Sequence, residues 1–191
     1  MFARTPRLLL RPGWMEDASA LTEAIGEPAV LRNLTRAPSP YGVGDARAFF
    51  SLPHDSRLPQ LLAFSRTQGA PRLVGGCGLH LAEDGAPEIG YWIARPYWGL
   101  GFATEAASAV LSMARAAGVA GIRAAHFADN PASGNVLRKL GFRYTGRLEQ
   151  RYSPARGTKA DCLIFEEGAS GRMTIDPAMD LYEDAIPALA A

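Results

Sequence analysis

The sequence predicts one domain of the mixed α/β (α+β) class, with a sheet that carries antiparallel strands at its edges. Its 191 residues suit a single domain with enough interior to bury a core. Hairpin-like strand patterns come first, strands and helices then alternate, and two more strand patterns follow. This mixed order differs from a regular doubly wound fold, in which strand and helix alternate throughout.

The first part of the chain contains a strand, two helices and a loop. The predicted strand, helix, loop and short helix cover residues 7–11, 15–25, 35–44 and 46–51. Acidic residues open the first helix, where they complement the helix dipole. Proline and glycine recur through the loop, and Gly44 or Asp45 is expected to cap the helix after it.

The rest of the chain alternates strands with helices before it ends in strands. Strands are predicted over residues 61–66, 73–81, 88–93, 122–128, 142–152 and 162–166. The first two of these strands form a hairpin. A helix follows the third strand, because apolar residues from Ala103 to Ala114 recur at helical spacing. A second helix follows the fourth strand, starting after Asn130 and stopping at Gly141.

Charge and cysteine content exclude several classes of function. Twenty Lys and Arg balance nineteen Asp and Glu without forming a basic stripe, so we expect no nucleic-acid partner. Cys77 and Cys162 lack a CxxC pairing and a histidine at ligand spacing, so we expect buried thiols and no metal. No long apolar segment of the signal-peptide or membrane-span kind is found, which predicts a cytoplasmic protein without membrane contact.

A glycine turn between a predicted strand and a predicted helix is the most informative local feature. Gly99 and Gly101 allow a sharp turn, because glycine adopts positive φ without a steric penalty. The following helix directs free N–H groups and its positive dipole end at the turn, as in phosphate and pyrophosphate sites. A nucleoside triphosphate loop would need Lys-Ser or Lys-Thr here, and neither pair is present. A dinucleotide fold would need glycine at Thr104 and an acid in strand 122–128, and it has neither.

A second motif follows at the next strand–helix junction, where residues 130–142 read NPASGNVLRKLGF. Together with EIGYWI at 88–93 and YWGLGFATEA at 97–106, it resembles the GNAT superfamily of N-acetyltransferases. The likeness is greatest to the Rim-type branch, which acts on ribosomal-protein N-termini and related amines. The resemblance extends over residues 7–167, so we expect an N-acetyltransferase domain there and a C-terminal tail over residues 168–191.

The resemblance implies a mostly antiparallel sheet, flanked by helices and splayed open between strands 88–93 and 122–128, with acetyl-CoA in the gap. Backbone groups of Trp92, Ile93 and Ala94 would pair with the pantetheine arm. The amides that would hold the pyrophosphate are those of Trp98, Gly99, Leu100, Gly101, Phe102, Ala103 and Thr104. The side chains that would line the arm and the thioester are Asn130, Ser133 and Asn135.

The resemblance also suggests which side chains act on the amine and on the thioester. Glu88 is the candidate base, directly or through a water, because it opens the strand beside the splay. Many GNAT enzymes protonate the leaving thiolate with a helical tyrosine, but Leu137 stands at the matching position here. Ser133, one helical turn earlier, is therefore the candidate proton donor.

Other groups near these strands have less defined roles. A backbone N–H near Ile93 or Ala94 would stabilise the oxyanion. His80 and His126 alternate with apolar neighbours in predicted strands, so we expect packed or surface histidines and assign them no role.

The sequence therefore predicts an acetyl-CoA-dependent N-acetyltransferase, without a metal, that transfers the acetyl group directly to a primary amine. The acceptor is expected to be a protein N-terminus or a small-molecule amine, and the protein a monomer or homodimer. The alternative is a non-catalytic acyl-CoA-binding or regulatory module of the same fold. A nicotinamide-dependent oxidoreductase is the weaker alternative, because the dinucleotide pattern is incomplete.

Overall fold

The computed structural model describes residues 1–53, 55, 57–66, 69–168 and 180–182. The strands are β1 (Phe2–Arg4), β2 (Leu8–Arg11), β3 (Gln60–Ser65), β4 (Arg72–Leu81), β5 (Pro87–Ile93), β6 (Arg123–Phe127), β7 (Phe142–Ser153), β8 (Thr158–Glu167) and β9 (Asp180–Tyr182). The helices are α1 (Ala18–Ile25), α2 (Pro28–Leu31), α3 (Val43–Phe50), α4 (Phe102–Ala116) and α5 (Pro131–Lys139), and short 3₁₀ turns cover Met15–Asp17 and Arg95–Tyr97.

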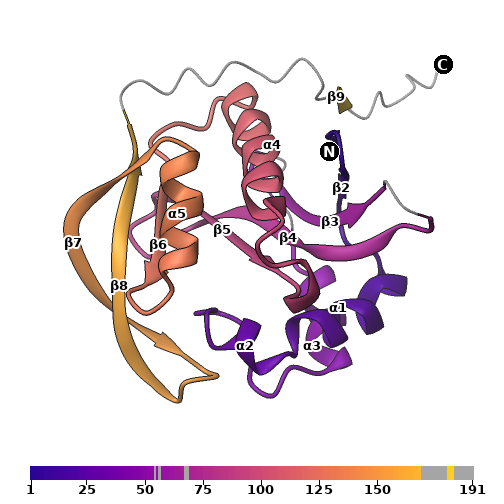
Figure 1. Cartoon of the computed structure of the whole chain (residues 1–191), viewed down its shortest axis with the longest axis horizontal. Coiled ribbons are helices and arrows are strands. Elements are labelled where there is room, and N and C mark those ends of the chain that lie inside the picture. Colours follow the sequence, from indigo (N-terminus) through magenta and orange to yellow (C-terminus); the bar gives the residue numbers. More distant parts are fainter. Residues whose placement is uncertain (54, 56, 67–68, 169–179, 183–191) are drawn as a thin grey trace.

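The strands form one sheet that opens in its middle. Their order is β7-β8-β6-β5-β4-β3-β2-β1-β9, and among the described residues every pair of neighbouring strands is antiparallel except β5–β6. The parallel pair is short, because only Glu88 with Arg123 and Ile89 with Ala124 are in register. Beyond these residues β5 and β6 separate, as Figure 1 shows. The predicted mixed sheet with a central splay is therefore confirmed.

Helices cover both faces of the sheet, and β3 shows how the two layers divide. Leu61 and Ala63 belong to the apolar cluster that contains α4, whereas Leu62 and Phe64 belong to the cluster that contains α1 and α3. Successive strand residues point to opposite faces, so α4 and α1 lie on opposite sides of the sheet (Figure 1). The buried face of α4, which includes Val110, is as predicted from its periodicity.

Some element boundaries differ from the sequence predictions. The helix predicted over 46–51 begins at Val43, and its N-cap is Gly42, so the expected cap at Gly44 or Asp45 is wrong. The reason is local, because the Asp45 carboxylate accepts a hydrogen bond from the Gly42 N–H at 2.8 Å and so acts from inside the first turn. The helix α2 and the strand β1 were not predicted, since each is too short to show a period.

The region predicted as a C-terminal tail contributes one short strand. β9 pairs antiparallel with β1 and extends the sheet at that edge. The other tail residues, 169–179 and 183–191, lie outside the described residues. Cys77 and Cys162 are buried free thiols, as predicted. None of the described helices has the length and apolar character needed to cross a membrane.

Candidate active site

A cavity of about 420 Å³ occupies the splay between β5 and β6. Its lining comes from both faces of the sheet, because it includes Val30 of α2 on one side and Val136 of α5 on the other. The cavity therefore passes through the sheet where β5 and β6 separate. The predicted site residues that line it are Glu88, Trp92, Ile93, Trp98, Gly99, Gly101, Phe102, Ala103, Thr104, Asn130, Ser133 and Asn135. Ala94 and Leu100 are not among the lining residues.

The glycine turn has the predicted backbone geometry. Gly99 and Gly101 have φ values of 77° and 82°, and α4 begins at the next residue, Phe102. The first N–H groups of α4 have no partner within the helix and face the turn. Arg7 holds the turn from the outside, because it donates to the Leu100 carbonyl at 2.9 Å and to the Glu105 carboxylate at 2.7 Å. The turn is thus fixed by protein contacts before any anion binds.

The end of β5 presents one backbone N–H to the splay. The Ala94 N–H donates to the Val74 carbonyl at 2.8 Å and so faces β4. Backbone groups alternate in direction along a strand, so the Ile93 N–H faces the splay. The Ile93 carbonyl accepts the indole N–H of Trp98 at 2.6 Å. Of the two backbone donors expected near an oxyanion, only that of Ile93 is directed into the cavity.

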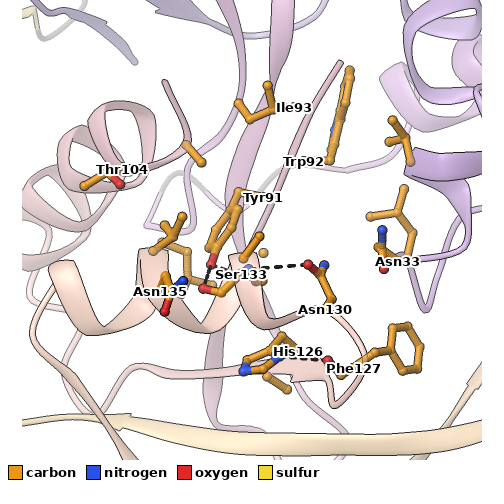
Figure 2. A pocket seen from close by; sticks show the side chains of 18 of the residues that line it. Asn33, Tyr91, Trp92, Ile93, Thr104, His126, Phe127, Asn130, Ser133 and Asn135 are labelled. Atoms are coloured by element: carbon orange, nitrogen blue, oxygen red, sulfur yellow. Dashed lines mark hydrogen bonds between the residues drawn. The ribbon is translucent and has the colours of Figure 1, made fainter. Parts of the chain in front are cut away.

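Asn130 and Ser133 form the N-terminal cap of α5, and Tyr91 of β5 contacts the Ser133 hydroxyl. The Asn130 side chain accepts a hydrogen bond from the Ser133 N–H at 3.4 Å, which is the N-cap contact expected before Pro131. Figure 2 shows Tyr91 reaching from β5 to Ser133, with 2.9 Å between the two side-chain oxygens. Burial raises the pKa of Tyr91, so its phenol stays protonated. Sequence reasoning missed Tyr91 because it lies in an apolar strand pattern.

Glu88 lies at the cavity wall in a buried ion pair. Its side chain is 8% exposed, and its two oxygens accept hydrogen bonds from Arg151 at 2.6 and 2.8 Å. Arg151 also pairs with Glu149 at 3.0 Å. His80 Nε2 lies 3.6 Å from Glu88 Oε1. Glu88 is therefore not a solvated residue at the end of a strand.

Both histidines expected to be packed or at the surface line the cavity. Burial lowers the pKa of His80, and Arg36 and Arg151 lower it further against the opposing effect of Glu88. His126 contacts the Phe127 carbonyl through Nδ1 at 2.8 Å, whereas its buried Nε2 has no hydrogen-bond partner among the described residues (Figure 2). Burial also lowers the pKa of His126. Both imidazoles are thus neutral near pH 7.

The fold and the cavity define a class of acyl-transferring proteins with a splayed sheet, and comparison with known sequences identifies the family. The sequence model of the acetyltransferase (GNAT) domain matches residues 7–143. An uncharacterized N-acetyltransferase, p20 of Bacillus licheniformis, is 31% identical over 166 residues, which are 84% of this chain and 92% of that protein. The chain belongs to the GNAT acetyltransferase family.

Solved structures show the same fold. A GNAT-family acetyltransferase from Bacillus anthracis has a TM-score of 0.72 at 24% identity, covering 87% of this chain and 97% of the other. The microcin C7 self-immunity acetyltransferase MccE, solved with acetyl-CoA and AMP, has a TM-score of 0.67 at 18% identity, covering 85% of this chain and 92% of its own. At these identities the likeness concerns the fold alone.

Proposed function

We propose that this protein is an acetyl-CoA-dependent N-acetyltransferase that transfers the acetyl group directly to a primary amine. The acceptor is a protein N-terminus or a small-molecule amine, and residues 7–167 carry the activity. The observation that carries the proposal is the cavity through the sheet, which joins the glycine turn on one face to the buried carboxylate of Glu88 on the other. Two substrates that meet at the splay can enter from opposite sides.

The residues on the α4 side fit acetyl-CoA. The exposed turn at Gly99 and Gly101 offers the unpaired N–H groups of α4 to a pyrophosphate. The Ile93 N–H lies at the open edge of β5, where an extended arm can add to the sheet. When bound, acetyl-CoA supplies the thioester whose acetyl group is transferred. The MccE complex named above supports this cosubstrate by analogy of fold.

On the opposite face the chain must remove a proton from the amine. A lysine-like amine has an ordinary pKa of about 10.4 and an α-amino group about 8, so either is mainly protonated at neutral pH. Glu88 accepts this proton, directly or through a water. Arg151 holds both carboxylate oxygens in place, and the Ile93 N–H stabilises the oxyanion.

The leaving sulfur needs a hydrogen-bond donor. Leu137 stands where many GNAT enzymes have a tyrosine donor, so Ser133 takes that role here. Its hydroxyl oxygen lies 2.9 Å from the Tyr91 phenol oxygen, and the phenol also donates to the Ser133 carbonyl at 3.0 Å. When the phenol proton turns to Ser133 Oγ, the Ser133 hydroxyl is free to donate to the sulfur. Tyr91 is thus a positioning residue from β5. Leu137 is 1% exposed in the core, so a donor from that position would need different packing.

The test is a thiol-release assay with acetyl-CoA and a broad panel of primary amines, together with calorimetric titration of CoA. We expect CoA release that depends on at least one amine. Tight CoA binding without turnover of any amine would favour the acyl-CoA-binding module instead. Binding of NAD(H) that CoA fails to displace would favour the oxidoreductase.

A further inference from the structure

His80 and Glu88 form a pair on the acceptor face of the sheet. The two residues are directly opposite each other in the β4–β5 ladder, so their side chains leave the same face. The next pair on that face is Gly78 with Gly90. Pro59 and Gln60 cover Gly78, whereas Gly90 lines the cavity and leaves a floor of bare backbone beside His80 and Glu88. A Cβ built at Gly90 would meet no atom closer than His80 Cε1, at 3.9 Å. The imidazole therefore borders open space.

The Glu88 carboxylate and the His80 imidazole differ in their hydrogen-bond partners. Glu88 shares both oxygens with Arg151, so protonating the carboxylate would weaken two charge-assisted hydrogen bonds. Among the described residues, no hydrogen bond occupies either ring nitrogen of His80, whose side chain is 26% exposed. His80 Nε2, which lies 3.6 Å from Glu88 Oε1, can therefore take up a proton without the loss of a hydrogen bond to Arg151.

We propose that His80 is the proton-relay partner of Glu88, receiving at Nε2 the proton that the acceptor amine loses. This inference rests on the proposed transferase function and deepens it. The amine N–H bond breaks, its electron pair stays on the nitrogen, and the proton passes through Glu88 to form the Nε2–H bond. The nitrogen electron pair forms the new N–C bond to the acetyl carbonyl carbon, and the thiolate leaves with the electron pair of the C–S bond and is protonated through Ser133. The imidazolium then releases the proton to solvent through its exposed edge, which restores the neutral ring.

The charges around His80 suit this cycle. Glu88 faces it from β5, Arg151 from β7, and Arg36 from the loop after α2. Burial and the two cations lower the pKa of His80, while Glu88 raises it, so the ring is neutral and able to accept above about pH 6.5. Glu88 then stabilises the imidazolium. Turnover should therefore fall as the pH drops through the His80 pKa.

The first test needs no acceptor, because it follows the three histidines of the chain by NMR titration. In the wild type we expect one resonance, assigned through its loss in His80→Gln, to titrate below the ordinary value. In Glu88→Gln its pKa should fall further, because the stabilising carboxylate is gone. A His80 titration that Glu88→Gln does not move would overturn the relay, whatever the activity of the protein.

The second test compares pH profiles of kcat. His80→Gln should lower kcat about tenfold to a hundredfold, remove the acid limb and leave CoA affinity unchanged. His126→Gln is the matched control, a second histidine of the cavity wall, and should keep the acid limb. If His80→Gln fails to fold, His80→Ala with added imidazole replaces it, and we expect imidazole to restore turnover. An acid limb that persists in His80→Gln would contradict the relay, whereas a wild type without amine-dependent turnover would contradict the proposed function.

Discussion

Replacing Arg151 by methionine should destabilise the protein through Glu88. The substitution keeps an apolar stem but removes the guanidinium, leaving a carboxylate that is 8% exposed without its cation. Removing one partner of a buried ion pair costs about 3–5 kcal/mol, and we expect the lower end because the Arg151 side chain is 24% exposed. For a domain of this size, a loss of about 3 kcal/mol lowers Tm by roughly 6–12 °C.

The assay is urea unfolding followed by far-UV circular dichroism, with thermal melts alongside. The double variant Glu88→Gln with Arg151→Met should recover most of the loss, because a neutral amide needs no cation. Arg151→Met should also raise the pKa of His80, since Arg151 lowers it in the wild type. Unfolding of Arg151→Met within about 0.5 kcal/mol of the wild type would refute the reasoning, because that is the range of ordinary surface substitutions.

Other substitutions around the cavity have distinct expected effects. Gly101→Val should weaken CoA binding roughly tenfold, because φ of 82° strains a branched residue; unchanged calorimetric affinity would remove the turn from the site. Gly90→Ala should raise KM for the acceptor without changing Tm, since its Cβ meets no close atom; an unchanged KM would mean that the acceptor avoids this floor. Gly134→Ala should lower the free energy of unfolding by about 1–3 kcal/mol, because its Cβ would lie 2.6 Å from His126 Nε2. Thermal melts measure this loss, and if adding His126→Ala does not restore stability, the clash with His126 is not its cause. Because burial lowers the pKa of His126, the folded state binds fewer protons than the unfolded state, so Tm should decrease as the pH drops below about 6.5. If His126→Gln shows the same dependence of Tm on pH as the wild type, another group is responsible for it.

Local chemistry made much of the fold predictable. The turn at Gly99 and Gly101 and the cap at Asn130 depend on neighbouring residues, so the sequence could indicate both, and their geometry is as expected. The boundary of α3 was harder to predict. Whether Asp45 caps a helix or lies inside its first turn depends on where Gly42 places the backbone.

The contacts of the candidate site depend on tertiary structure instead. Arg151 and Glu88 are 63 positions apart, and no local pattern pairs them. The pairing of His80 with Glu88 was easier to predict, because the short turn after β4 fixes the register of β4 and β5 and places the two residues opposite each other. An explicit hairpin register would have found this pair. The Tyr91 contact with Ser133 required knowledge of how α5 lies across the splay.

The most direct test of the central claim is mass analysis of the acceptor after reaction with acetyl-CoA, alongside the amount of CoA released. We predict that a primary amine gains one acetyl group on its nitrogen for each CoA released, and that Glu88→Gln slows this transfer without weakening CoA binding. CoA binding with no acetylated amine in the panel, or acetylation that proceeds at the wild-type rate in Glu88→Gln, would contradict the account.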